Sequence, residues 1–320
     1  MKSFSHSYRI AAAQTSPQFL DKTRSIQKAC DLIHEAAKKG AKLVVFPEVF
    51  IPGYPDWIWV VPNSQAALLN DLYVRLIENS VAIPDAATEQ LCQAAKKAKI
   101  HVVMGLHERN REASNYSLYN TMLVIDDQGN IVGKHRKLIP TGGERLVWAM
   151  GDGSTLQVFD TVLGKLGGLI CWENYMPLAR QAMYAEGAQI LLAPTWDKSE
   201  NWLNSLRHIA REGGLFVVGC CSAIRMEDIP DELEFKSYYP EGKEWINTGN
   251  SCIINPRGEF IAGPLEAKED ILYADIDLRE IAAAKRMFDV AGHYARPDVF
   301  QFAVNRKATM IMPSKTGSNS

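Results

Sequence analysis

Short apolar runs alternate along the chain with longer stretches in which apolar residues recur every three or four positions. The first pattern is typical of buried strands and the second of amphipathic helices. Ile26, Cys30, Ile33 and Ala37, for example, predict a helix that Gly40 can end. We expect strands at 9–14, 42–46, 101–106, 119–125, 131–135, 156–161, 165–170, 189–193, 215–219, 251–255, 259–262 and 271–276, and helices at 21–39, 86–99, 177–186 and 201–212.

The alternation of strand and helix predicts an α/β fold. Because many strands are joined by few linkers, residues 1–312 are expected to form a single domain, and the polar stretch 313–320 a disordered tail. Residues 39–47 and 186–194 both run from a helix end through a buried strand to a proline. This echo fits two related halves packed face to face, and it equally fits any ordinary junction of helix and strand.

Composition and charge exclude several partners. Hydrophobic residues make up 47% and charged residues 22% of the 320, as in ordinary globular proteins. A formal net charge of −2 gives no basic field to hold nucleic acid or an anionic membrane. No stretch resembles a signal peptide or the roughly 18 to 20 apolar residues of a membrane span, which predicts a cytoplasmic location. Six cysteines without a CxxC pair indicate free thiols, among them a candidate nucleophile.

Cys171 is the first candidate for chemistry. It follows the apolar run 165–170 where the chain turns toward a predicted helix. The carboxyl end of a strand is a common place for a nucleophile, because a sharp turn there exposes the side chain and nearby backbone N–H groups. Position alone equally suits a small apolar side chain that fills the end of a strand.

Glu48 is the second candidate. It follows the buried strand 42–46 and precedes an aromatic, proline-rich run at 51–59. Desolvation beside aromatic rings raises the proton affinity of a carboxylate, which suits a general acid or base at neutral pH. The alternative is a loop glutamate beside an aromatic cluster that serves packing or subunit contact.

A basic cluster at 134–137 ends the second strand of a predicted hairpin. Side chains alternate along a strand, so His135 and Lys137 share one face and Arg136 points to the other. Lys137 in a pocket would stabilise a thiolate and negative charge developing on a substrate. His135 would instead pair with a cysteine in a Cys-His hydrolase, and a solvated strand edge is a third possibility.

Glu48, Lys137 and Cys171 occur in that order in the settings FPE, RKL and ICWEN, and this pattern resembles the nitrilase superfamily. The resemblance covers nearly the whole chain, through AAAQTSPQFLDK, FPEVFIPGYP, HRKLIPT, GERLVW, GGLICWENYMPLAR, LLAPTW and GHYARPDVF. It implies an α/β fold of the four-layer α-β-β-α sandwich type and a catalytic triad of these three residues. It also implies that Glu144 orients the triad and that His135 is structural.

Details resemble the true nitrilase branch. Cys171-Trp172-Glu173 differs from aliphatic amidases, which typically place tyrosine and aspartate after the nucleophile. Nitrilases often have a histidine just after the threonine that corresponds to Thr141, where this chain has Gly142. The implied reaction converts an organic nitrile to the carboxylic acid and ammonia through a thioimidate and a thioester on Cys171, with no metal or organic cofactor. The implied pocket residues are Tyr54, Thr141, Trp148, Trp172 and Trp196.

The resemblance further implies a homodimer or a larger spiral homo-oligomer, with 57–79 and 226–245 as surface excursions suited to subunit contacts. An amidase or N-carbamoyl amide hydrolase, or a cyanide-degrading enzyme, would use the same triad. A silent binding protein of the same fold would be expected to have a broken triad. We expect the pairs 107–108 and 220–221 to be ordinary surface and strand-end residues.

Overall fold

Two β-sheets form the centre of the molecule, which a computed structural model describes over residues 7–111 and 114–309. The predicted tail at 313–320 lies outside these residues. The first sheet contains, in spatial order, β13 (Asp270–Asp277), β1 (Ser7–Gln14), β2 (Ala41–Val45), β3 (His101–Arg109), β4 (Leu118–Ile125) and β5 (Ile131–Arg136). The second contains β10 (Ala223–Arg225), β11 (Trp245–Ile254), β9 (Phe216–Cys221), β8 (Ile190–Thr195), β7 (Gly164–Gly168) and β6 (Phe159–Thr161), with β12 (Phe260–Glu266) paired to β11.

The helices α1 (Lys22–Lys38) and α4 (Ala86–Ala98) cover the outer face of the first sheet. Asp21 caps α1 by accepting the N–H of Arg24, and Asp85 caps α4 through the N–H groups of Ala87 and Thr88. Gly40 follows α1 with a φ of +87°, as its expected role at the helix end requires.

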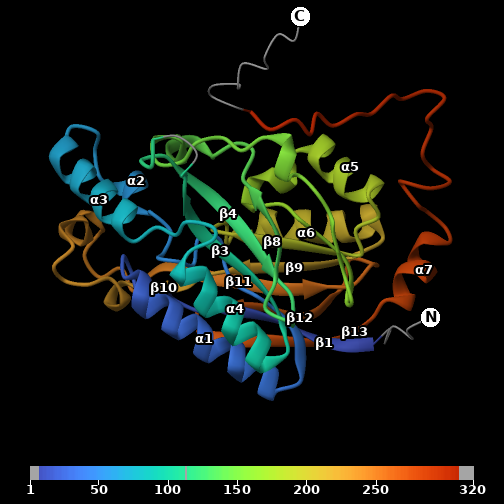
Figure 1. Ribbon diagram of the computed structural model, residues 1–320, viewed down its shortest axis with the longest axis horizontal. Coiled ribbons are helices and arrows are strands. Elements are labelled where there is room, and N and C mark those ends of the chain that lie inside the picture. The colour runs from blue at the N-terminus through green and yellow to red at the C-terminus, as the bar shows by residue number, and fades with distance from the viewer. Residues whose placement is uncertain (1–6, 112–113, 310–320) are drawn as a thin grey trace, which may run out of the picture.

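On the second sheet, α5 (Pro177–Ala185) and α6 (Glu200–Gly213) cover the outer face, and a short helix α7 (Arg279–Lys285) follows β13 (Figure 1). Between the sheets lies a core to which Ile10, Leu43 and Val45 contribute from one side and Ile190 and Val218 from the other. Alternate residues of one strand face different layers, because Val44 of β2 packs against the helices while its two neighbours face the other sheet. The expected four-layer α-β-β-α sandwich is therefore confirmed.

The segments 39–47 and 186–194 hold β2 and β8, which occupy inner positions in the two facing sheets. Both strands have parallel partners on each side. This placement agrees with two related halves packed face to face. None of the described helices is long and apolar enough to cross a bilayer.

The two expected surface excursions pack against each other. The first forms α2 (Trp57–Val60) and α3 (Ala66–Glu78), and the second contains the 3₁₀ turn Glu234–Tyr238. Trp57 and Phe235 are both buried, with ring centroids 5.7 Å apart. Together they form a third apolar cluster that continues into the aromatic residues near Glu48 and thereby supports one wall of the site.

One expected strand is shorter than its apolar pattern indicated. Residues 156–158 lie outside β6, which begins at Phe159. The N–H of Val158 donates instead to the carboxylate of Glu186 at 2.8 Å, so a side chain takes the place of a strand partner.

Candidate active site

Glu48 lies on a loop that follows β2 and crosses the edge of β3. The N–H of Phe46 bonds to the carbonyl of Val103, and that of Ile51 to the carbonyl of Gly105. A Cβ atom at Gly105 would lie 2.0 Å from the carbonyl oxygen of Pro47, so only glycine permits this approach. The crossing buries the Glu48 side chain, which is 1% exposed.

Lys137 joins two carboxylates. Its Nζ atom donates to Oε1 of Glu48 at 2.9 Å and to Oε2 of Glu144 at 2.7 Å. Glu144 also accepts the hydroxyl of Tyr54 at 2.7 Å and the N–H of Thr141 at 2.7 Å. Glu144 is thus fixed by donors on both of its oxygens, and it fixes the ammonium group of Lys137.

Cys171 follows β7 and begins the 3₁₀ turn Cys171–Tyr175 with a φ of +52°. A positive φ is costly for a residue with a Cβ atom, and such strain is frequent at functional sites. The amide of Asn174 holds this conformation by donating to the carbonyls of Leu169 and Cys171 at 2.8 and 2.9 Å. The hydroxyl of Thr195 donates to the Cys171 sulfur at 3.3 Å.

Burial and charge set the proton affinities of the three side chains. Burial raises the pKa of Glu48 to about 6, although Lys137 opposes this rise. Burial, aided by the charge of Glu48, raises the pKa of the Cys171 thiol to about 12. Burial alone would lower the pKa of Lys137, but Glu48 raises it above its usual value. At pH 7 the site therefore holds a thiol, a carboxylate and an ammonium ion.

This arrangement favours proton transfer coupled to bond formation. Oε2 of Glu48 is buried and has no hydrogen-bond partner among the described residues, so it remains able to accept a proton. The Cys171 thiol is far less acidic than the carboxyl group, so a free thiolate is not formed in advance. A thiol in this setting can lose its proton as it attacks an electrophilic carbon, with the positive charge of Lys137 nearby.

Three of the five predicted pocket residues form an aromatic cluster beside Glu144. The ring of Tyr54 stacks on Trp196 with centroids 4.2 Å apart and an interplanar angle of 5°. Trp148 meets Tyr54 edge-on at 5.8 Å. His107 fixes Trp148 by accepting its indole N–H at 2.9 Å.

The other two predicted pocket residues lie differently. Thr141 is partly buried and contacts Glu144 through its backbone N–H. The ring of Trp172 is 49% exposed, and its N–H donates to Asp197 at 2.8 Å. Trp172 therefore stands at the outer rim of the described site, while Tyr54 and Trp148 are buried within it.

Gly142, where nitrilases often have a histidine, has a φ of +51°. A Cβ atom there would lie 3.1 Å from the ring of Trp59. Trp59 in turn donates its indole N–H to the hydroxyl of Tyr54 at 3.2 Å. The glycine thus lets an aromatic ring cover the turn that carries Glu144.

Sequence reasoning missed some contacts that support the candidate site. Asn120 donates to Oε1 of Glu48 at 2.7 Å, and Thr195 contacts the candidate nucleophile. Asp56 accepts the indole N–H of Trp196 at 3.1 Å and the hydroxyl of Tyr239 at 2.5 Å, and so fixes the stacked ring. The polar Asn120 within the mostly apolar strand β4 was a visible signal.

His135 does not pair with a cysteine. Its Nδ1 atom lies 3.1 Å from the carbonyl of Thr155, and its Nε2 atom lies 3.0 Å from Glu173, which agrees with a structural role. The expectation of ordinary surface residues at 107–108 is wrong, because His107 is fully buried and Glu108 is 2% exposed. The pair 220–221 is likewise buried, at the end of the inner strand β9.

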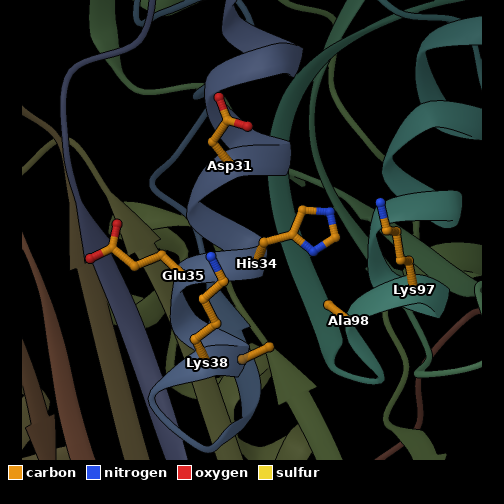
Figure 2. Close-up of a pocket in the computed structure, with 7 residues that line it drawn as sticks. Asp31, His34, Glu35, Lys38, Lys97 and Ala98 are labelled. Atoms are coloured by element: carbon orange, nitrogen blue, oxygen red, sulfur yellow. The ribbon is translucent and has the colours of Figure 1, made fainter.

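The described residues also enclose surface depressions without catalytic groups. One, of 790 Å³, lies between α1 and α4 (Figure 2). Asp31, Glu35 and Lys38 project from α1 there, and Lys97 from α4. These charged side chains are exposed, and the depression contains no thiol. We assign no site to it.

Known proteins share the sequence and the fold. Residues 9–286 match the carbon-nitrogen hydrolase family. "Nitrilase 2" of Arabidopsis thaliana is 42% identical over 306 residues, covering 93% of this chain and 88% of that protein. "Bifunctional nitrilase/nitrile hydratase NIT4B" of Nicotiana tabacum is 43% identical over 308 residues, covering 94% and 86%. The crystal structure of Saccharomyces cerevisiae Nit3, a member of branch 10 of the nitrilase superfamily, has a TM-score of 0.71 at 22% identity, covering 92% of this chain and 98% of that chain.

These likenesses and the four-layer sandwich define the class of protein as a hydrolase that acts on carbon–nitrogen bonds. Within that class, the chain belongs to the carbon-nitrogen hydrolase family, and the resemblance to the nitrilase superfamily is confirmed.

Proposed function

We propose that the protein is a nitrilase that converts an organic nitrile to the carboxylic acid and ammonia, with Cys171 as nucleophile, Glu48 as general base and Lys137 as the electrostatic group. The contact that carries the proposal is the bridge from Lys137 to both Glu48 and Glu144, within the electrostatic reach of the Cys171 thiol. The names of the relatives that align over nearly the whole chain support nitriles as the substrate class.

In the first step Glu48 takes the proton from the thiol as sulfur bonds to the nitrile carbon. Negative charge then develops on the nitrile nitrogen, and Lys137 and the backbone N–H of Trp172 stabilise it. Glu48 delivers the proton to this nitrogen, which gives a neutral thioimidate on Cys171. Proton transfer through Oε2 of Glu48 leaves its contact with Lys137 intact.

In the second step Glu48 takes a proton from water, and the resulting hydroxide adds to the thioimidate carbon. Protonation of nitrogen and cleavage of the carbon–nitrogen bond release ammonia and leave a thioester. A second water adds with the same base, the carbon–sulfur bond breaks and the acid leaves. The sum is one nitrile and two waters to one acid and one ammonia. Cleavage of the carbon–sulfur bond before nitrogen leaves would release the amide instead.

The aromatic cluster fits an apolar substituent on the nitrile. Tyr54, Trp148 and Trp196 present ring surface next to the residues that hold Lys137, and we propose that they contact the substrate. We propose that Thr141 and Trp172 complete the pocket at its rim. All of the steps above use side chains and backbone groups of this chain together with water.

The test is turnover of a panel of aliphatic, aromatic and arylacetonitriles, together with cyanide and the matching amides, with ammonia, acid and amide quantified. The wild type is expected to give acid and ammonia from nitriles, and Cys171→Ala to give neither. Cys30→Ala, in a partly exposed thiol of α1, is the matched control and should keep full activity. Turnover of amides alone, or activity that survives Cys171→Ala, would overturn the proposal.

We also propose that copies of this chain associate into a homodimer or a larger spiral assembly. Large apolar side chains are exposed along the segment that follows α7, among them Met287, Tyr294 and Phe300. Light scattering on the full chain should give a mass at least twice the 35.7 kDa of one copy. A monomer at micromolar concentration would contradict this.

A further inference from the structure

Glu173 is a buried carboxylate that the proposed reaction does not use. Its side chain is fully buried, and each of its oxygens accepts a different backbone N–H. Leu138 donates to Oε1 at 2.5 Å, and Ile170 donates to Oε2 at 2.6 Å. The two donors lie on segments that leave different sheets, because Leu138 follows β5 of the first sheet and Ile170 follows β7 of the second.

His135 completes the contacts of this carboxylate. Its Nε2 atom lies 3.1 Å from Oε1 and 3.0 Å from Oε2 of Glu173, and its Nδ1 atom lies 3.1 Å from the carbonyl of Thr155. Carbonyl and carboxylate oxygens only accept, so both ring nitrogens carry hydrogen and the ring is an imidazolium ion. Burial would lower the pKa of His135, but Glu173 raises it above its usual value. The pair is therefore a buried ion pair.

The two backbone donors adjoin the reacting side chains. Leu138 is the residue after Lys137, and Ile170 is the residue before Cys171. One carboxylate thus holds the chain beside the ammonium group and the chain beside the thiol at the same time. Reacting groups must be held within about 0.5 Å of the productive geometry, and a group bonded to both segments restricts their relative movement.

We propose that Glu173, charge-balanced by His135, is a positioning residue that sets the place of Lys137 relative to Cys171. The proposal rests on the proposed function of the triad and deepens it. The Glu173 side chain bonds neither to Lys137 nor to Cys171 itself, and it acts only through the backbone N–H groups of their chain neighbours. The glutamate of the Cys171-Trp172-Glu173 sequence thereby has a physical role.

The competing role is a buried ion pair that stabilises the fold and nothing more. Glu108 provides the matched control for it. Its carboxylate is 2% exposed and accepts bonds from Arg136 and Thr121, but Arg136 points to the opposite face of β5 from His135. A substitution of Glu108 on β3 therefore disturbs a buried ion pair with the guanidinium of Arg136, which precedes Lys137, but it removes no acceptor from a backbone N–H beside Lys137 or Cys171.

The experiment compares Glu173→Gln with Glu108→Gln. The glutamine keeps the shape of the side chain but puts an NH₂ group against a backbone N–H and removes the charge that holds His135. Two quantities are measured: kcat and KM for a nitrile, and the rate at which iodoacetamide alkylates Cys171, followed by mass spectrometry of the Cys171 peptide. The alkylation rate needs no nitrile turnover, so it reports on the proposal even if the wild type hydrolyses no nitrile.

We expect Glu173→Gln to lower kcat about 100-fold with little change in KM, because displacement of catalytic groups by about 1 Å has effects of that size. Alkylation of Cys171 should slow about tenfold, since the negative charge that develops on sulfur as it attacks iodoacetamide is no longer placed beside Lys137. Glu108→Gln should lower the melting temperature but keep both rates near those of the wild type. Equal rates in the two variants, or unchanged alkylation in Glu173→Gln, would overturn the proposal.

Glu173→Asp keeps the proposal testable if the glutamine variant fails to fold. Aspartate retains the charge opposite His135 but is one methylene shorter, so it does not reach the N–H groups of Leu138 and Ile170 together. A role of the charge alone predicts wild-type kcat and alkylation for this variant, and that result would overturn the positioning role. Reduced rates in a folded Glu173→Asp variant are the expected result.

Discussion

The ammonium group of Lys137 donates to Oε1 of Glu48 at 2.9 Å, and this contact leaves Oε2 as the carboxylate oxygen for the proposed proton transfer. Oε1 also accepts the amide of Asn120, whereas Oε2 has no hydrogen-bond partner among the described residues. The occupied oxygen fixes the carboxylate, and in the proposed mechanism the other receives a proton from the Cys171 thiol or from water. One side chain is thereby both anchored and reactive.

The pH dependence of turnover follows from the raised pKa of Glu48. Since burial raises this pKa to about 6, the carboxylate loses its ability to accept a proton as the pH falls through 6. We expect kcat/KM to be constant near pH 7.5 and to fall about tenfold per pH unit below about 5.5. The pH dependence of kcat/KM is measured from the ammonia released from a nitrile between pH 4.5 and 8.5. Circular dichroism over the same range is the control for unfolding. Unchanged kcat/KM at pH 5 would show that Glu48 is not the base.

Asn120 tunes that pKa. Its hydrogen bond to Oε1 stabilises the charged form of Glu48 and so lowers the pKa. A hydrogen bond to a charged group contributes about 1.5 kcal/mol. Asn120→Leu is therefore expected to raise, by about one unit, the pH at which kcat/KM begins to fall on the acid side. Thr121→Val is the matched control, because the neighbouring Thr121 is also buried but donates to Glu108. If kcat/KM fell at the same pH on the acid side in both variants, this role of Asn120 would be contradicted.

The sequence predicted the elements whose patterning is local. The periodicity of Ile26, Ile33 and their neighbours located α1, and the apolar run before Pro47 located β2. It missed α3 because it predicts only a surface excursion at 57–79, although Leu72 and Leu76 are buried at helical spacing. Local patterning reports on one face of one element, and it therefore predicted single elements and an α/β fold, whereas the four layers followed from the resemblance to the nitrilase superfamily.

The candidate triad came from motifs, but the contacts that support it did not. Asn120 lies 72 positions from Glu48 in sequence, and no local pattern connects a strand amide with a distant loop carboxylate. The sequence likewise did not predict the exposed position of Trp172, which follows the turn that begins at the positive φ of Cys171. Pairing over long separations and unusual backbone angles are set by the whole fold.

Tyr54 makes two contacts that one substitution separates. Its hydroxyl donates to Glu144, and its ring stacks on Trp196. Tyr54→Phe keeps the stack and removes the hydrogen bond, so we expect kcat to fall about tenfold with KM little changed, since such a bond to a charged group contributes about 1.5 kcal/mol. Tyr73→Phe, which removes the hydrogen bond from Tyr73 to the carbonyl of Tyr116 at 2.8 Å, is the control and should leave kcat within about twofold. A rise in KM alone for Tyr54→Phe would contradict the role of its hydroxyl.

Gly105 connects the stability of the fold to the position of Glu48. A Cβ atom there would lie 2.0 Å from the carbonyl oxygen of Pro47 and 2.6 Å from the N–H nitrogen of Val49, so the loop that carries Glu48 must move. We expect Gly105→Ala to lower the free energy of unfolding by about 1–3 kcal/mol, as overpacking does. It should also lower kcat at least about tenfold, because the base is displaced.

The control for Gly105→Ala is Gly40→Ala. Gly40 has a φ of +87°, and nothing lies within 4 Å of the place where a Cβ atom would be, so alanine there costs about 1–2 kcal/mol of backbone strain without moving Glu48. Urea unfolding and nitrile turnover, measured on both variants, separate the two effects. A Gly105→Ala protein that is destabilised yet retains the kcat of Gly40→Ala would show that the crossing at β3 does not position the base.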